Sequence, residues 1–477
     1  MLLGLLALAV SLVTGGAWAA APWSAPQDVS SPSAQLGSPS LAFDRHGRAL
    51  AAWSWYRSSG VQAGWRSSTR PPGRATVFAP ERPAPPLGLV DFPLPAAPVL
   101  FGSTRALAIE QRNLGYDARC DGYRFSLAAR FGRSDGVFGV AEPLARVLVD
   151  MLVVDVAPAA NDHGDALAAW SEISPGATGC RTRQRPGAPR RRRAVRVVMR
   201  SPGTAFGAPV TLSSGAPPGA VLASVGSGGD MLVAWQRAGV LEARYRRARG
   251  HWGPVLSVAK LQPGAGPGGP LAAVTSDGRA YLVWASGGGG RRPGRQVVHA
   301  ASLALGAKRF RAVQTIDSAP WPGGGDLRPI PTIVRLKLSP GGSRATLAWT
   351  AWDGAHWRAR VAETGRNGRF SRPVTATPPG SDYAVDDVAV RRDGRLGLAL
   401  QSALGSMGMR LSVALGSARG AFGFPEEVAT GDIRQSSIAA SPLTSQFTIV
   451  WSELTAAEVP LPPLPFLVRS ATRTKPG

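Results

Sequence analysis

Acidic and basic side chains recur where short apolar segments begin, and there they could bind a ligand or transfer protons. Paired carboxylates at a suitable separation can hydrolyse a glycosidic bond. Asp386 and Asp387 are adjacent, so we expect that they cannot both point to one side of a strand. We assign no catalytic residue and predict a binding site, with solvated loop charges as the alternative, at Asp91, Asp150, Asp326, Arg328, Asp382, Asp386 and Arg434, and with Asp155 and Asp387 as further candidates.

Motifs of known catalytic chemistry are absent from the sequence. It contains no H-E-x-x-H or G-x-S-x-G pattern, no phosphate-binding loop and no acidic calcium loop, and its five histidines have no ligand spacing. We therefore predict no metal and no cofactor. A protein that binds is favoured over one that catalyses, and a glycoside hydrolase or lyase with carboxylates at the site is the alternative.

The elements that must position these residues are indicated by an internal repeat. A small turn residue stands six positions before a tryptophan, with alternating small apolar residues between them. A second apolar segment and an aromatic residue followed by proline come after most copies, so each copy predicts four short strands. The copies are Gly47/Trp53, Gly164/Trp170, Gly229/Trp235, Gly278/Trp284, Ser343/Trp349 and Ser445/Trp451, with degenerate copies at Ser103/Ile109 and Gly394/Leu400.

Units of this length with four strands are typical of β-propeller blades. We predict an all-β fold in which residues 20–477 form a single eight-bladed β-propeller of four-stranded blades, or a seven-bladed one if the Ser103 copy is an insertion. The last copy lacks a fourth strand, whereas Trp23–Val29 has the pattern of a surplus one. We expect this N-terminal strand to pair with Phe466–Ala471, complete the last blade and close the ring. The repeated tryptophans are expected to pack between sheets, with sugar stacking as the alternative.

The N-terminal segment and the two cysteines concern export. Residues 1–19 are uncharged and mostly apolar and end in Ala17-Trp18-Ala19, which predicts a signal peptide, with an uncleaved anchor as the alternative. No second segment of spanning length follows, so we expect no transmembrane span after cleavage. Cys120 and Cys180 fall in long loops of adjacent repeats, and in an exported protein we predict that they form a disulfide; two free thiols are the alternative.

The formal net charge of +24 comes almost wholly from arginine. The arginines occur in every repeat, and the dense run Arg190–Arg193 lies in an insertion flanked by glycine and proline. We interpret the run as a solvated loop, with a patch for an anionic polymer as the alternative, and we expect no nucleic-acid partner.

The repeat resembles secreted bacterial β-propellers of the sialidase-like and BNR-repeat kind, over residues 23–471. The aspartate box of those proteins has its tryptophan three residues after glycine, whereas here it is six after, as in Gly47/Trp53 and Gly278/Trp284. The resemblance implies an arginine triad and a tyrosine nucleophile, which we do not transfer to any residue. Long insertions follow the second and fourth strands, so we expect the ligand on that face. We predict a monomeric, secreted or envelope-associated module that binds a glycan, a peptide or an envelope component at the mouth of a central channel.

Overall fold

The computed structural model describes residues 23–31, 35–36, 38–56, 63–73, 77–83, 99–101, 105–117, 122–132, 136–149, 155–174, 192–215, 218–261, 269–287, 293–322, 334–404, 408–444, 446–454 and 466–473. The predicted signal peptide and both cysteines of the predicted disulfide lie outside these residues. Within the described ranges, no helix has the length and apolarity of a membrane span.

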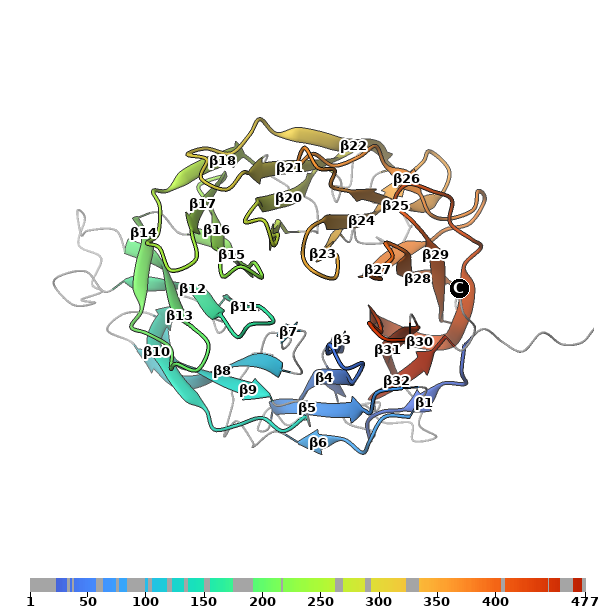
Figure 1. Cartoon of the computed structure of the whole chain (residues 1–477), viewed down its shortest axis with the longest axis horizontal. Helices are drawn as coiled ribbons and strands as arrows, with labels where there is room; N and C mark the ends of the chain where they lie inside the picture. Colours follow the sequence, from blue (N-terminus) through green and yellow to red (C-terminus); the bar gives the residue numbers. More distant parts are fainter. Residues whose placement is uncertain are drawn as a thin grey trace, which may run out of the picture.

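The described residues form antiparallel sheets that stand around a central axis, so the protein is an all-β β-propeller (Figure 1). Six sheets of four or five strands are separate blades. The first three comprise β3 (Ser40–Phe43), β4 (Ala49–Tyr56), β5 (Ala63–Arg70) and β6 (Arg82–Pro83) with β2 (Gln35–Leu36) beside β4; β7 (Val99–Phe101), β8 (Arg105–Asp117), β9 (Gly122–Gly132) and β10 (Glu142–Val149); and β11 (Val156–Ala160), β12 (Ala166–Ser174), β13 (Arg192–Arg200) and β14 (Val210–Gly215). The next three comprise β15 (Pro218–Val225), β16 (Met231–Arg237), β17 (Val240–Arg246) and β18 (Leu256–Lys260); β19 (Leu271–Val274), β20 (Ala280–Ser286), β21 (Gly294–Leu303) and β22 (Gln314–Trp321); and β23 (Val334–Leu338), β24 (Ala345–Trp352), β25 (Trp357–Glu363) and β26 (Val374–Thr375).

The remaining strands form one continuous seven-stranded sheet, and this corrects the expectation of eight, or seven, separate four-stranded blades. Its strands are β27 (Ala384–Val390), β28 (Leu396–Ala403), β29 (Met409–Gly416), β30 (Glu426–Ala440), β31 (Phe447–Leu454), β32 (Phe466–Thr472) and β1 (Gln27–Asp28). The sheet is continuous because β30 extends for 15 residues without a turn. Its first half pairs with β29 and its second half, from Asp432, pairs with β31.

The N-terminal segment pairs with the last strand, as the sequence predicts. Gln27 lies opposite Ser470 and Asp28 opposite Arg469 in the antiparallel ladder of β1 and β32. The Val29 amide donates to the Val468 carbonyl at 2.7 Å, which extends this pairing. The edge of β32 is therefore covered by β1.

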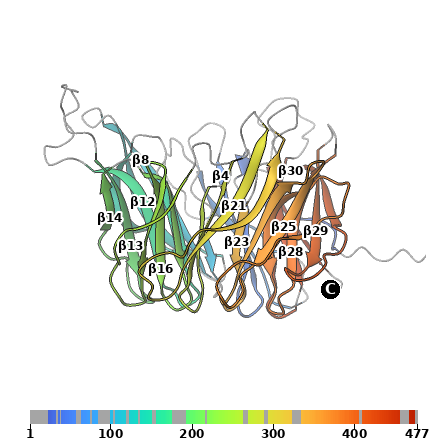
Figure 2. The same ribbon diagram turned by 90° about the horizontal axis from the view of Figure 1, so that it is seen from above.

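The turn between the first and second strands of a blade is stabilised by an aspartate and a glycine. In the first blade, Asp44 Oδ1 accepts the amides of His46 at 2.8 Å and Arg48 at 2.7 Å, and Gly47 has a φ of +77°. The described turns between first and second strands and between third and fourth strands gather at the lower edge of Figure 2. We name this end of the sheets the turn face.

The second strand of each blade is buried on both faces, which explains its near-continuous apolar sequence. In β12, Ala168 and Trp170 pack with Ile109 of the preceding blade, whereas Leu167 packs with Trp235 of the next one. All six repeated tryptophans are at most 4% exposed. The prediction that they form the core between sheets is confirmed, and their use as sugar platforms is wrong.

Each buried indole needs a hydrogen-bond acceptor, and four of the repeated tryptophans use the same kind of partner. Trp170 Nε1 donates to Glu172 at 2.9 Å, and Glu172 is 2.6 Å from Arg196. Equivalent chains of indole, carboxylate and guanidinium are Trp235–Glu242–Arg237, Trp349–Asp317–Arg360 and Trp451–Glu453–Arg469. Several acidic residues of this basic protein therefore act as hydrogen-bond acceptors for buried tryptophans.

The first strands contact one another in a closed circuit of β3, β7, β11, β15, β19, β23, β27 and β30. Side chains of one first strand hydrogen-bond backbone amides of the next: Asp155 accepts from Val221 at 2.7 Å, and Ser224 accepts from Val274 at 3.0 Å. Such bonds satisfy amides at the inner edge of each sheet that no further strand pairs with.

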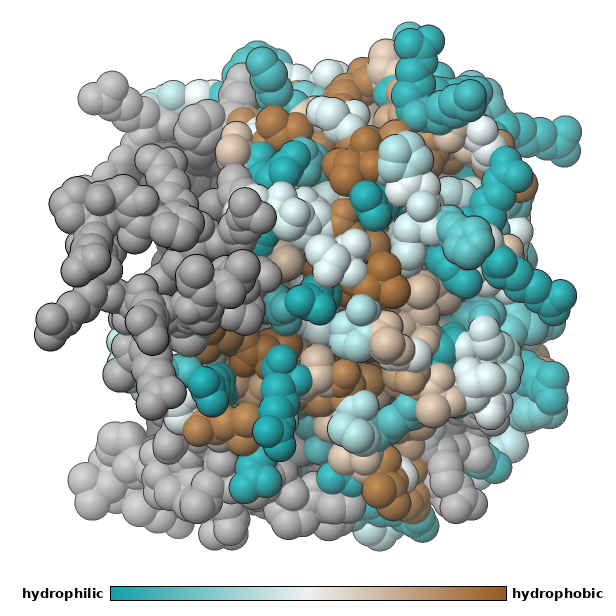
Figure 3. Space-filling model, turned by 90° about the vertical axis from the view of Figure 1, so that its left-hand side faces the viewer, coloured by the Kyte–Doolittle hydropathy of each residue, from teal (hydrophilic) through white to brown (hydrophobic). Residues whose placement is uncertain are grey.

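Exposed apolar side chains are dispersed over the surface, and two of them lie in connections between third and fourth strands. Val140 is 92% exposed and Phe424 is 82% exposed. Figure 3 shows brown apolar residues interspersed with white and teal ones on the side that carries β14. Single exposed apolar residues of this kind are normal on a globular surface.

Replacement of Trp451 on β31, which packs with Leu411 and Val413 on β29, tests the role of the repeated tryptophan. We expect Trp451→Ala to lower the free energy of unfolding by about 3–5 kcal/mol, because it leaves a cavity and removes the indole N–H that donates to Glu453. Urea denaturation measures this change. The control is Phe424→Ala, for which we expect less than about 0.5 kcal/mol. Equal losses in the two variants would contradict the assignment of Trp451 to the core.

Candidate functional site on the innermost strands

Of the residues predicted to bind a ligand, Asp382, Asp386 and Arg434, with the further candidates Asp155 and Asp387, are in the described part of the chain. Asp91, Asp150, Asp326 and Arg328 lie outside it, so their prediction is untested. Asp386 and Arg434 meet at the junction of β27, β28 and β30, where Gln401 Nε2 is 3.0 Å from Asp386 Oδ2 and 3.4 Å from the Arg434 carbonyl. Asp382 has different partners.

Asp386 is 5% exposed, and one oxygen of its carboxylate accepts three hydrogen bonds. Oδ2 accepts from the amide and the hydroxyl of Ser436, the latter at 2.6 Å, and from Gln401. Arg335 of β23 donates from Nε to the Asp386 carbonyl at 2.6 Å, and its Nη2 lies 3.9 Å from Oδ1. This side chain therefore ties β27 to three other strands.

Asp387 points to the same neighbouring strand as Asp386. Its Oδ2 accepts from the Ser437 hydroxyl at 3.0 Å and from the Ile438 amide at 3.1 Å. Adjacent residues of a regular strand would face opposite sides, but the pairing of β27 with β28 shifts register between Val385 and Asp387. The expectation that the two carboxylates cannot share a side is thus wrong, because this irregularity re-aims one of them.

Cationic side chains around these carboxylates reach solvent. The side chains of Arg335 and Lys337, two residues apart on β23, are 39% and 45% exposed, and that of Arg434 is 56% exposed. Lys337 Nζ is 3.4 Å from Asp387 Oδ1, and Arg434 pairs with Asp432 at 2.9 Å. Asp386 and Asp387 are buried and Asp432 is 41% exposed, whereas the cation that pairs with each of them reaches solvent. The arrangement therefore presents cationic hydrogen-bond donors to an incoming group. We name Arg335, Lys337 and Arg434 the inner cation set.

Asp382 lies in the connection that leads into β27 and contacts the turn between β24 and β25. Its Oδ1 accepts from the Trp357 amide at 2.7 Å and is 3.5 Å from His356 Nδ1. It therefore fixes the end of a hairpin, apart from the contacts that Asp386 makes. Asp155 likewise accepts a hydrogen bond from the Val221 amide of the neighbouring strand β15.

Burial is the main electrostatic influence on these acids. It raises the pKa of the Asp386 carboxyl to about 6, and the negative charge of Asp387 acts in the same direction. Hydrogen bonds from Ser436 and the charge of Arg335 oppose the shift. Burial also raises the pKa of Asp155, in part offset by the hydrogen bond from the Val221 amide.

Arg335, Lys337, Gln401, Ser436 and Ser437 are site residues that the sequence reasoning missed. One signal was available: in the strand sequence VRLKL, Arg335 and Lys337 alternate with apolar residues, which places both on one face. The serine contacts depend on how first strands of neighbouring repeats are aligned, which a single sequence does not encode. Among the described residues, no group of three or more potential metal ligands gathers.

Comparisons with known proteins give similarity to solved propeller structures only. No family model matches the chain, and no curated protein sequence matches it significantly. Similar solved structures include a prolyl endopeptidase (15% identity, TM-score 0.42, 91% of this chain and 55% of that chain) and the K499G mutant of the NanB sialidase from Streptococcus pneumoniae (11%, 0.36, 91% and 68%). A protein of unknown function from Dyadobacter fermentans DSM 18053 is also similar (11%, 0.38, 94% and 98%).

This chain thus spans about half the length of the prolyl endopeptidase that it matches. Sialidases at 11% identity are among the similar solved structures.

The raised pKa of Asp386 predicts a pH dependence of stability. A carboxyl that binds its proton more tightly in the folded state makes the free energy of unfolding fall as pH rises from about 4 to about 6. We expect Asp386→Asn to remove up to about 3 kcal/mol of this fall, the equivalent of two pKa units. Urea denaturation between pH 4 and pH 7 measures it, with the exposed Asp393→Asn as control. An unchanged pH profile in Asp386→Asn would show that Asp386 does not titrate in this range.

Proposed function

We propose that the protein is an extracellular binding module that holds a glycan, a peptide or an envelope component at the mouth of the central channel, through the inner cation set. One observation supports this proposal most directly. Asp386 and Asp387 are buried and hydrogen-bonded to β30, whereas Arg335 and Lys337 stay accessible beside them. A carboxylate, phosphate or sulfate group on the ligand would complement these cations.

Export and a monomeric state are part of this proposal. The apolar residues 1–19 with the Ala17-Trp18-Ala19 triplet support removal of a signal peptide, after which the module would be secreted or attached to the envelope.

We further propose that the ring has eight blade positions and is closed by the N-terminal strand. The circuit of eight first strands supports this count, with β30 serving as the fourth strand of one blade and the first strand of the next. The pairing of β1 with β32 supports closure.

A glycoside hydrolase or lyase is the second candidate, and one observation favours it. A carboxyl whose pKa is raised to about 6, as in Asp386, exchanges its proton closer to neutral pH than an ordinary aspartate, as a general acid must. Assays with a panel of glycosides decide between the two: hydrolysis that is lost in Asp386→Asn would favour the enzyme, whereas the binding proposal expects no turnover.

Lys337→Gln tests the binding proposal. After a ligand is selected from glycan and peptide arrays, we expect this variant to weaken binding at least about tenfold, because it removes a partly desolvated charge contact. The matched control is Lys260→Gln, an exposed lysine on β18 with the same change of charge. Isothermal titration calorimetry gives both dissociation constants. Equal affinity of Lys337→Gln and the unmodified protein would place the ligand elsewhere.

A further inference from the structure

Exposed cations are concentrated on three consecutive turns of the turn face. These turns join the third and fourth strands of the β15–β18, β19–β22 and β23–β26 sheets and span residues 247–255, 304–313 and 364–373. None of the three contains an aspartate or a glutamate. Their exposed cationic residues are Arg247, Arg249, Lys308, Arg309, Arg311, Arg366, Arg369 and Arg372, which we name the basic turn cluster.

The three turns form one surface. Arg311 Nη1 donates to the Asn367 carbonyl at 2.8 Å, and Gln314 exchanges hydrogen bonds with Phe370 at 2.9 and 3.1 Å, which joins the second turn to the third. The Arg247 guanidinium lies against Gly306, because a Cβ added to Gly306 would be 2.3 Å from Arg247 Nη2. This contact joins the first turn to the second.

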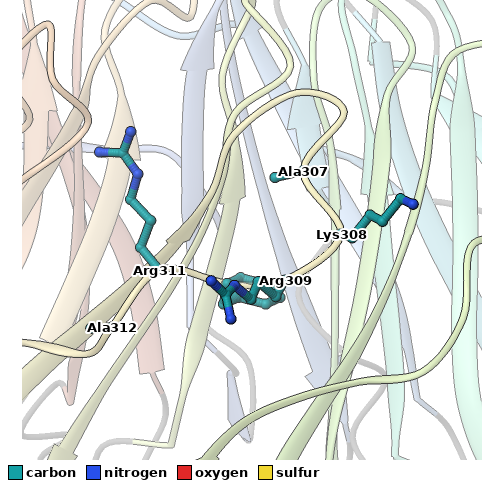
Figure 4. A pocket seen from close by; sticks show the side chains of 6 residues that line it. Ala307, Lys308, Arg309, Arg311 and Ala312 are labelled. Carbon is teal, nitrogen blue, oxygen red and sulfur yellow. The ribbon is translucent and has the colours of Figure 1, made fainter.

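The middle turn borders an open hollow of about 700 Å³ that is lined by residues 307–312. Figure 4 shows Lys308 and Arg311 leaving the turn on opposite sides, with Arg309 between them. Because these cations diverge, a ligand with several separated negative groups fits the cluster better than a single small anion.

The charge of the cluster is not neutralised within the described residues. None of its eight members forms an ion pair with a carboxylate there. The nearby acids have other partners: Asp230 is buried and accepts from the Ala248 amide at 3.1 Å, Asp277 is 4.0 Å from Arg279, and Glu363 pairs with Arg344 at 3.3 Å and with Arg419 at 3.8 Å. Like charges held together in this way raise the local potential and attract a polyanion.

The side chains around the cations decide which polyanion fits. Phe310 and Phe370 are 8% and 5% exposed and Trp252 is half-buried, which leaves His251 as the one exposed ring on these turns. A single ring is no platform for a row of stacked bases. These turns expose three large apolar side chains, Leu305 at 54%, Val313 at 40% and Val255 at 37%. They stand among eight exposed cations, whereas membrane docking needs a broad apolar face. Guanidinium groups bind sulfate and carboxylate groups in bidentate geometry.

We propose that the basic turn cluster binds a soluble anionic polysaccharide that carries sulfate or carboxylate groups. The cluster lies on turns between third and fourth strands, whereas the inner cation set lies on the innermost strands β23 and β30, so the two are different surfaces.

Heparin is the probe for this proposal, at 0.15 M and higher salt. The test variant is Lys308→Gln/Arg309→Gln/Arg372→Gln, and the matched control is Arg45→Gln/Arg82→Gln/Arg146→Gln, which removes the same charge from exposed positions of the first two blades. We expect the test variant to lose at least about tenfold in affinity and the control less than about twofold. The salt dependence of the test variant should also become shallower, by about two to three in log K against log salt.

A second readout needs no ligand: we expect the thermal midpoint of the test variant to be unchanged or higher, since repulsion is relieved. Equal losses in the two variants would overturn the proposal, because binding would then follow net charge. Tighter binding of duplex DNA or of phosphatidylglycerol vesicles than of heparin, abolished in the test variant, would show that the class of polyanion is wrong.

Discussion

Burial of the second strand on both faces is the constraint on which the rest of the structure depends. Each blade covers one face of its neighbour's second strand, so small apolar residues alternate with a tryptophan that fills the gap between sheets, as Trp170 does. No blade can satisfy this burial alone, and the stability of each therefore depends on the next. The buried indole N–H groups depend in the same way on carboxylates that accept their hydrogen bonds, as Glu172 does for Trp170.

The two ends of the chain must meet the same constraint. Val29 packs with Val450 and Val468 of the seven-stranded sheet and with Trp53 of the first blade, so its side chain connects these two sheets. Arg70 crosses the same junction, because it is 2% exposed and donates to the hydroxyls of Thr448 and Thr472. Burial lowers the pKa of Arg70 to about 10. A scaffold held together in this way leaves its innermost strands and its turns free to carry charged groups.

The sequence alone predicted the β-propeller class, the buried tryptophans and the pairing of Trp23–Val29 with the last strand, because these follow from periodicity and from a missing strand matched by a surplus one. It did not predict the continuity of β30, since a connection of zero length leaves no turn residue. The candidate site was predicted only in part. Asp386 was identified, but its contact with Ser436 and the neighbouring cations Arg335 and Lys337 depend on the alignment of neighbouring repeats. The basic turn cluster was missed because its arginines lie about 60 residues apart and meet only in the ring.

Amide hydrogen exchange, followed strand by strand in Val29→Asp, tests most directly whether neighbouring sheets hold one another through the chain ends. The substitution places a charge in the cluster that joins β1 and β32 to the first blade. The account predicts lower protection in β31 and β32 and also in β4, although β4 forms no hydrogen bonds with β1. A loss of protection confined to β1 would contradict it.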